Sequence, residues 1–181
     1  KELEKHMQET SYVRAYMKND LYTGKHVTHK LWVGDYLPEK SQNTFEDMAD
    51  KANGIKKIAV LRADVDNLGT TFVSGFRRGE DDRYETLSRT ATLSRQLSLF
   101  FKGYINTILK NGEQSMFADA GARNVLIVYS GGDDVFLAGA WNEVISAFCD
   151  IRKELERFSL GSLTISGGIS VYDPSYPINV M

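Results

Sequence analysis

The fold is decided by the stretch Asn124-Val-Leu-Ile-Val-Tyr-Ser-Gly-Gly-Asp-Asp-Val-Phe-Leu-Ala-Gly-Ala140. Two apolar runs, 125–129 and 135–138, flank a Gly-Gly pair, and this pattern predicts a β-hairpin with Asp133 and Asp134 at its tip. Because both faces of both runs are apolar, we expect two central strands in a sheet covered on both faces. The tip is then the part of the hairpin that meets solvent or a ligand.

The two aspartates at the tip repel each other, and a hairpin has no need of them. A divalent cation makes such a pair favourable, since Mg²⁺ binds one or two carboxylates and completes its shell with water and substrate phosphates. Gly131 and Gly132 permit a positive φ and the close approach of a phosphate. The alternative interpretation is a plain hairpin turn that binds nothing.

The composition is that of an ordinary globular protein of 181 residues with a formal charge of −2. This charge gives no overall basic surface, so any contact with nucleic acid is local or made through a partner. The sequence contains neither a membrane-spanning apolar run nor a signal-peptide pattern, and we expect a cytoplasmic location without membrane contact. The single Cys149 excludes an internal disulfide and a cysteine-based zinc site.

The region upstream of Ile55 lacks the regular pattern of the rest. Residues 1–18 have a loose helical spacing that predicts a connecting helix, and 19–54 are irregular, with short strands around 31–33 and a short helix over 45–52. We expect a linker region over 1–54 and one domain over 55–181 that is cut at its C-terminal end. The chain opens on Lys1 within a helix-like stretch, which indicates a piece of a longer protein.

From Ile55 onward the order of elements indicates an α+β fold. A strand over 58–63, a helix over about 84–110, the hairpin, a helix ending near Phe158 and a strand over about 162–171 follow one another. This order is typical of a ferredoxin-like βαββαβ sheet with both helices on one face. In that topology Asp64, at the end of the first strand, lies beside the hairpin tip.

Converging carboxylates from two strands suggest a specific chemistry. Two divalent ions about 4 Å apart can activate an attacking hydroxyl and stabilise the leaving oxygen of a phosphoryl transfer. Asp66 shares the sheet face of Asp64 if the strand continues that far. Asp66 and Asn67 are equally well placed to cap the helix that follows.

Other polar and aromatic residues are better explained without a ligand. His26 and His29 have no third metal ligand nearby, and Arg77, Arg78 and Arg83 lie in an acidic loop. Phe100, Phe101 and Tyr104 have the helical spacing of core residues, and Trp141 beside the hairpin is explained by packing. Ser74, Ser130 and Cys149 lack the neighbouring histidine that a nucleophile needs.

Asp64-Val-Asp66, together with Gly131-Gly-Asp-Asp134, resembles the palm shared by diguanylate cyclases and the large subunit of type III CRISPR effector complexes. The type III-A version is the more similar, on motifs that span most of the chain. These are Leu61-Arg-Ala-Asp-Val-Asp-Asn-Leu-Gly69, Tyr129-Ser-Gly-Gly-Asp-Asp134, Gly139-Ala-Trp141 and Ser166-Gly-Gly-Ile169, and, in the linker, Lys18-Asn19, Leu31-Trp-Val-Gly-Asp-Tyr36 and Gly54-Ile55.

The resemblance implies the second palm, with its Gly-Gly-Asp-Asp motif, of a subunit that polymerises ATP into cyclic oligoadenylates when its complex holds target RNA. It implies that Asp64, Asp133 and Asp134 are catalytic and bind Mg²⁺ or Mn²⁺. Ser130, Gly131 and Gly132 would lie along the triphosphate, and Asp66 and Asn67 are further nucleotide-binding candidates. The implied partners are the other subunits of the complex and, through them, CRISPR RNA and target RNA.

The sequence also departs from this family. The nuclease domain, the first palm, the cysteine-rich zinc element and the C-terminal helical domain are not in this segment, and neither is the helix that usually follows the last strand. We therefore expect the isolated fragment to be inactive.

Three other functions fit part of the pattern. They are a diguanylate cyclase, a palm that only binds nucleotide or a neighbouring protein, and a template-dependent polymerase. Aspartate instead of glutamate at position 134, together with the upstream linker, argues against the first. Retention of the carboxylates argues against the second, and the lack of any resemblance to fingers or a template channel argues against the third.

Overall fold

The computed structural model describes residues 5, 15–20, 28–38, 44–77, 79 and 81–177. The chain divides into two compact units, Lys1–Val33 and Gly34–Met181. The expected domain boundary between residues 54 and 55 stays a prediction. Among the described residues, no helix combines the length and the apolar character that crossing a membrane requires.

The first unit contains two short parallel strands, β1 (Tyr16–Lys18) and β2 (His29–Leu31). The helix predicted over 1–18 is therefore wrong at its C-terminal end, and most of its remainder lies outside the described residues. Asn19 has a positive φ of 54°, which stops any helix at this point. Its side-chain amide donates to the Val33 carbonyl, and its side-chain oxygen accepts from the Val33 N–H.

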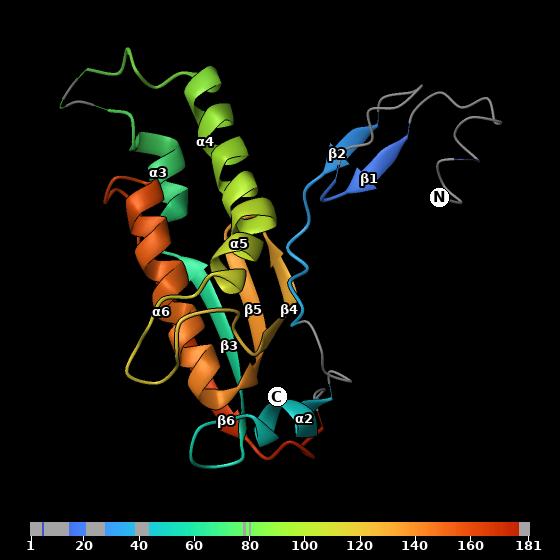
Figure 1. Cartoon of the computed structure of the whole chain (residues 1–181). Helices are drawn as coiled ribbons and strands as arrows, with labels where there is room; N and C mark the ends of the chain where they lie inside the picture. Colours follow the sequence, from blue (N-terminus) through green and yellow to red (C-terminus); the bar gives the residue numbers. More distant parts are fainter. Residues whose placement is uncertain are drawn as a thin grey trace. The chain divides into compact units, whose positions relative to one another are not determined.

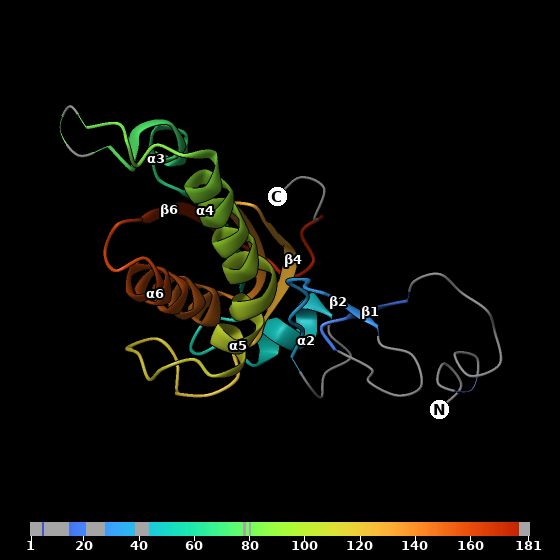
Figure 2. The same ribbon diagram turned by 90° about the horizontal axis from the view of Figure 1, so that it is seen from above.

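The second unit is built on a four-stranded antiparallel sheet of order β4-β5-β3-β6, and the predicted ferredoxin-like arrangement is confirmed. Helices cover one face of this sheet (Figures 1 and 2). The strands are β3 (Ile58–Val65), β4 (Val125–Gly131), β5 (Asp134–Ala140) and β6 (Ile165–Tyr172). The helical segments are α2 (Phe45–Asp50), α3 (Leu68–Ser74), α4 (Leu87–Leu99), the π-helical η1 (Phe100–Tyr104), α5 (Ile105–Lys110) and α6 (Trp141–Phe158).

One prediction about the hairpin is wrong: β4 is an edge strand rather than a central one. The first strand of the sheet, β3, pairs with β5 and β6, so β4 has a strand neighbour on one side only. Val128 and Tyr129 are accordingly 42% and 53% exposed. The pairing with β5 is also irregular between Ile127 and Tyr129. This bulge reverses the alternation, so that Ile127 packs against the core and Tyr129 faces the other side of the sheet.

The long helix predicted over 84–110 forms with an interruption. Thr86 caps its start by accepting from the Arg89 N–H, and Asn111 follows its last residue. In η1 the Ile105 N–H bonds to the Phe100 carbonyl, five residues earlier, which is the pattern of a π-helix. This extra residue allows both Phe100 and Phe101 to be fully buried, which confirms the prediction that they belong to the core.

The core lies between the sheet and the helices, and β3 shows how the sequence separates the two faces. Leu61, Ala63 and Val65 are buried on the helical side, whereas Arg62 and Asp64 alternate with them and are exposed. Because the side-chain period of a strand is two, this alternation places Asp64 on the face opposite the core helices η1, α5 and α6. We call this the open face.

A fully buried arginine fastens the loop before β4 to α6. The Nε atom of Arg123 donates to Asp150 at 2.7 Å, its Nη1 atom donates to the Asp119 carbonyl at 2.9 Å, and Glu143 lies 3.6 Å from Nη1. Burial raises the pKa of both carboxyl groups, while the guanidinium opposes this rise. A Cβ atom at Gly112 would lie 2.2 Å from the Arg123 Nε, so this position requires glycine.

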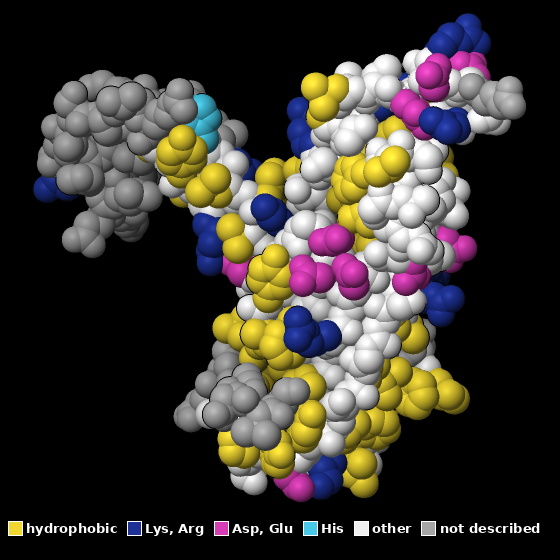
Figure 3. All heavy atoms as spheres, turned by 180° about the vertical axis from the view of Figure 1, so that it is seen from behind, with side chains coloured by type: hydrophobic (Ala, Val, Ile, Leu, Met, Phe, Trp, Pro, Cys, Tyr) yellow, Lys and Arg dark blue, Asp and Glu magenta, His cyan; other side chains and the backbone are white. Residues whose placement is uncertain are grey.

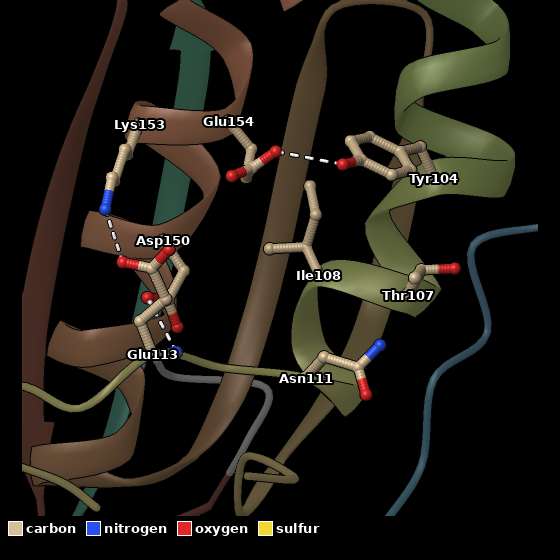
Figure 4. A pocket seen from close by; sticks show the side chains of 8 residues that line it. All are labelled: Tyr104, Thr107, Ile108, Asn111, Glu113, Asp150, Lys153 and Glu154. Atoms are coloured by element: carbon tan, nitrogen blue, oxygen red, sulfur yellow. Dashed lines mark hydrogen bonds and ion pairs between the residues drawn. The ribbon is translucent and has the colours of Figure 1, made fainter. Parts of the chain in front are cut away.

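A small pocket of about 150 Å³ lies beside this arginine, between α5 and α6 (Figure 4). Its charged side chains and Tyr104 are already paired: Tyr104 donates to Glu154 at 2.9 Å, Lys153 pairs with Glu113, and Asp150 pairs with Arg123. The pKa of the Tyr104 hydroxyl is raised, mainly because of its hydrogen bond to Glu154. These pairs explain the pocket as part of the packing of the two helices.

Candidate functional site

Strand register places two of the predicted site residues directly opposite each other. Asp64 of β3 pairs with Asp134 of β5, and on its other side Asp64 pairs with Ser166 of β6. Opposite residues of antiparallel strands have Cβ atoms roughly 4.5–5.5 Å apart, and like charges in this position are destabilising. A bound cation removes this repulsion, so the pair fits a cation-binding role.

The third aspartate reaches the same place through the turn. Gly132 has a φ of 68°, which breaks the alternation of the hairpin, and the Asp133 carbonyl accepts from the Val65 N–H at 3.1 Å. The tip of the hairpin is thereby fixed to the end of β3. As a result Asp133 and Asp134, although adjacent, line the same hollow as Asp64.

This hollow has a volume of about 1070 Å³ and lies on the open face. Figure 3 views this face and shows acidic side chains gathered near its middle. Around the three aspartates the lining combines one basic, two aromatic, two small apolar and three small polar or glycine residues: Arg62, Tyr129, Phe136, Ala63, Val135, Ser166, Gly167 and Gly168.

The donor set suits a hard cation that binds substrate as well as protein. Within the described part of the chain, no three His, Cys, Asp or Glu side chains form a complete metal-binding group. Mg²⁺ characteristically takes one or two protein carboxylates and leaves its other positions to water and phosphate oxygens. Asp64 and Asp134, with Asp133 beside them, provide that incomplete set.

Asp66 and Asn67 do not join this group. The Asp66 carboxylate accepts from Thr164 Oγ1 at 2.6 Å, and bonds from Thr164 and then Ser166 lower its pKa. Asn67 begins α3 with a φ of 53°, and its side chain makes no capping hydrogen bond. Neither residue lines the hollow, and their role in nucleotide binding stays a prediction.

The three predicted residues at the Gly-Gly turn, 130–132, also differ in position. Ser130 points to the helical side, where its hydroxyl donates to the Phe101 carbonyl at 2.5 Å. Gly131 pairs with Asp134 at the end of the hairpin, and Gly132 forms the turn. The hydroxyl of Ser130 therefore holds the hairpin against η1, and the contact of residues 130–132 with a triphosphate stays a prediction.

Sequence reasoning missed the rest of the hollow, above all Arg62. This residue precedes Asp64 by two positions in the same strand, so the period of two was the signal that could have found it. Its guanidinium carbon lies 5.9 Å from the ring centre of Phe136, its partner in strand register. Tyr129 could not have been found in this way, because a bulge decides which way it faces.

The explanations without a ligand hold for the loop arginines and for Trp141, whereas Tyr104 is 42% exposed instead of in the core and His29 lies in β2 instead of in a loop. Arg77 pairs with Glu85 at 3.0 Å and Arg83 with Asp81 at 2.7 Å, as expected of a solvated loop. The Trp141 Nε1 atom donates to the carbonyls of residues 53 and 55, which is a packing role. Arg78 and His26 lie outside the described residues.

The segment after Val33 supports the hairpin and gives a testable prediction. The Tyr36 carbonyl accepts from the Ile127 N–H at 3.0 Å. A Cβ atom at Gly34 would lie 2.8 Å from both the Phe101 carbonyl oxygen and the Ser130 Cβ. We expect Gly34→Ala to lower the free energy of unfolding by about 1–3 kcal/mol, because backbone atoms must shift to admit the methyl group.

Equilibrium urea unfolding of the chain measures this effect. Gly69→Ala is the control, since a Cβ atom there meets nothing within 4 Å and α3 gains a better helix former. Equal stability of the Gly34→Ala variant and the unchanged chain would show that this close approach does not constrain the hairpin.

Two curated relatives align with nearly the whole chain. The CRISPR system single-strand-specific deoxyribonuclease Cas10/Csm1 (subtype III-A) of Mycobacterium tuberculosis is 42% identical over 98% of this chain and 22% of its own length. The protein of the same name from Enterococcus italicus is 45% identical over 93% of this chain and 21% of its own length. The chain thus spans about a fifth of the length of these relatives.

Solved structures agree with the sequence relatives. Csm1 of T. onnurineus superimposes with a TM-score of 0.78 at 29% identity, covering 93% of this chain and 25% of that one. A Csm1–Csm4 cassette in complex with cA4 superimposes with a TM-score of 0.74 at 27% sequence identity, covering 92% of this chain and 24% of that one. A cassette in complex with AMPPNP superimposes with a TM-score of 0.75 at 28% identity, covering 90% of this chain and 24% of that one. The sequence-family model for the Cas10/Cmr2 second palm domain matches residues 57–181 of this chain. The chain belongs to the Cas10/Cmr2 family, of which it carries the second palm domain.

Proposed function

We propose that the hollow on the open face is a nucleotidyl-transfer site that joins ATP molecules into cyclic oligoadenylates. The observation that carries this proposal is the register of Asp64 against Asp134, with Asp133 brought to the same hollow by the turn. The similarity to Csm1 in complexes with cA4 and AMPPNP supports ATP as the substrate. We further propose that the site works inside a type III-A effector complex that holds CRISPR RNA and target RNA.

The reaction is an attack of a ribose hydroxyl on the α-phosphate of ATP, in which a P–O bond forms and pyrophosphate leaves. Repeating it on a growing chain and then within that chain gives a ring. Asp64, Asp133 and Asp134 would hold one or two Mg²⁺ or Mn²⁺ ions, which lower the charge of the phosphates and activate the attacking hydroxyl when bound. The chain's own contribution is to position the substrate and to supply fixed charges.

The hollow offers groups for the remainder of the nucleotide. The planar ring of Phe136 and the adjacent Arg62 form a surface on which a base can stack. Beside them on β6, Gly168 has nothing within 4 Å of its Cβ position, so this side of the hollow is open. Such a surface accepts any purine, and it therefore supports nucleotide binding rather than a choice between adenine and guanine.

The test uses the full-length protein in its complex with guide RNA and target RNA. The complex is incubated with Mg²⁺ and either ATP or GTP, and the products are identified by mass spectrometry. We expect cyclic oligoadenylates from ATP, and none from a complex carrying both Asp133→Ala and Asp134→Ala. Single-strand DNA cleavage, the activity named for the curated relatives, serves as the control for assembly of the variant complex.

Other results assign other functions. A cyclic dinucleotide formed from GTP would make the protein a diguanylate cyclase. Nucleotide binding without any product would leave a palm that only binds nucleotide. Unchanged products from the double variant would remove the aspartates of the hairpin from the reaction.

A further inference from the structure

We propose that Lys102 binds the phosphates of the substrate at the rim of the hollow, and that the π-helical segment η1 exists to place it there. This inference rests on the proposed function, because it assigns a further residue to the same site. Lys102 is exposed and lies in η1, on the helical side of the sheet, and its position in the sequence is outside every motif named above.

The side chain of Lys102 extends to the end of the hairpin. A Cβ atom at Gly131 would lie 3.4 Å from the Lys102 Cε and 3.5 Å from the Tyr129 hydroxyl oxygen. Tyr129 lines the hollow, so Lys102 reaches the point where the hollow meets the edge strand β4. These distances are those of van der Waals contact, so the Lys102 side chain packs against the end of the hairpin.

The backbone around Lys102 is fixed on both sides. The preceding carbonyl, of Phe101, accepts the Ser130 hydroxyl bond at 2.5 Å, which joins η1 to the hairpin. The Lys102 carbonyl accepts from Asn106 Nδ2 at 3.4 Å, and the side-chain oxygen of Asn106 accepts from the Asp35 N–H at 3.0 Å. An exposed side chain on such a firmly held backbone is prepositioned for a ligand.

The charge of Lys102 has no partner in the described part of the protein. Two other lysines are neutralised by neighbours, Lys57 by Asp173 at 2.6 Å and Lys153 by Glu113. Among the described residues, no ion pair of this kind involves Lys102. A triphosphate brings several negative charges to a site that already holds three aspartates, and a lysine ammonium is a common point-charge ligand for phosphate. π-Helical turns occur frequently at functional sites, which is consistent with this use.

The experiment compares three variants in the full effector complex with guide and target RNA. For Lys102→Met we expect the KM for ATP to rise about 10- to 100-fold, the range of a hydrogen bond to a charged group, with a smaller change in kcat. Lys102→Arg keeps the charge and retains most of the activity. Lys110→Met removes another exposed lysine of the same helical stretch, in α5, and leaves the KM unchanged.

A binding measurement separates phosphate contact from other effects. AMPPNP and AMP are titrated into complexes with and without Lys102→Met, and we expect a loss of affinity for AMPPNP but less than a twofold change for AMP. Lys102→Gln is the second variant should Lys102→Met assemble poorly. An unchanged KM and unchanged affinity for AMPPNP in these variants would overturn the proposal.

The proposed function fails in a different way. If the unchanged complex binds AMPPNP but forms no product from ATP, the proposed reaction is wrong, while the binding titrations still decide the role of Lys102. If the unchanged complex does not bind AMPPNP at all, both proposals are wrong.

Discussion

We expect Asp64→Asn to lower the rate of oligoadenylate formation by about 1000-fold, because loss of a metal-binding carboxylate removes several kcal/mol of charge stabilisation. Asp66→Asn should change the rate less than about tenfold on the same scale, since Asp66 bonds to Thr164 and does not line the hollow. The two residues are matched in type and stand two positions apart. The measurement is the initial rate in the assembled complex at saturating Mg²⁺.

The free energy of unfolding provides an independent test of the roles of Asp64 and Asp66. Without divalent cations Asp64→Asn removes the repulsion with Asp134 and should raise the free energy of unfolding by about 0.2–1 kcal/mol. Asp66→Asn should lower it, since the hydrogen bonds from Thr164 and Ser166 favour the charged carboxylate. Equal rates for the two variants, or a lower stability of Asp64→Asn, would contradict the assignment of Asp64 as a metal ligand.

The second large effect is expected at Arg123, far from the hollow. Arg123→Met keeps much of the side-chain volume but leaves Asp150 and Glu143 without their buried cation. Removal of one partner from a buried ion pair costs about 3–5 kcal/mol. We therefore expect a loss of this size in urea unfolding of the chain, and loss of folded protein at elevated temperature.

A double variant and the pH dependence of unfolding test whether uncompensated charge causes this loss of stability. Adding Asp150→Asn to Arg123→Met removes the uncompensated charge and should recover part of the loss. Burial raises the pKa of the Asp150 carboxyl in the folded state, so its protonated form favours folding. Without Arg123 this pKa rises further, and the deficit of the variant should shrink as the pH falls below neutrality. A deficit that is independent of pH would point to packing instead of charge.

The elements and their order were predictable because each has its own sequence signal. The Gly-Gly pair between apolar runs predicted the hairpin, and the spacing of Val144, Ile151 and Leu155 predicted α6, in which all three are fully buried. The convergence of Asp64 with the tip of the hairpin followed from the topology alone.

The details that single residues decide were not predictable from local pattern. The bulge after Ile127 turns Tyr129 toward the hollow, and η1 places Lys102 at the hairpin, yet both are one-residue insertions in otherwise regular elements. The edge position of β4 was missed because an apolar run reads as buried wherever it lies. The buried Arg123 was missed because its partners come from a distant helix.

Because the candidate site depends on the pairing of β3 with β5, it forms only when the chain is completely folded. Asp64 and Asp134 are far apart in the sequence, and only closure of the long intervening segment, which includes the whole of α4 and α5, brings them together. Non-local pairings of this kind form slowly and late in folding. A partly folded chain therefore lacks the proposed cation site, and an ion or nucleotide bound there would shift the population toward the completed sheet by mass action.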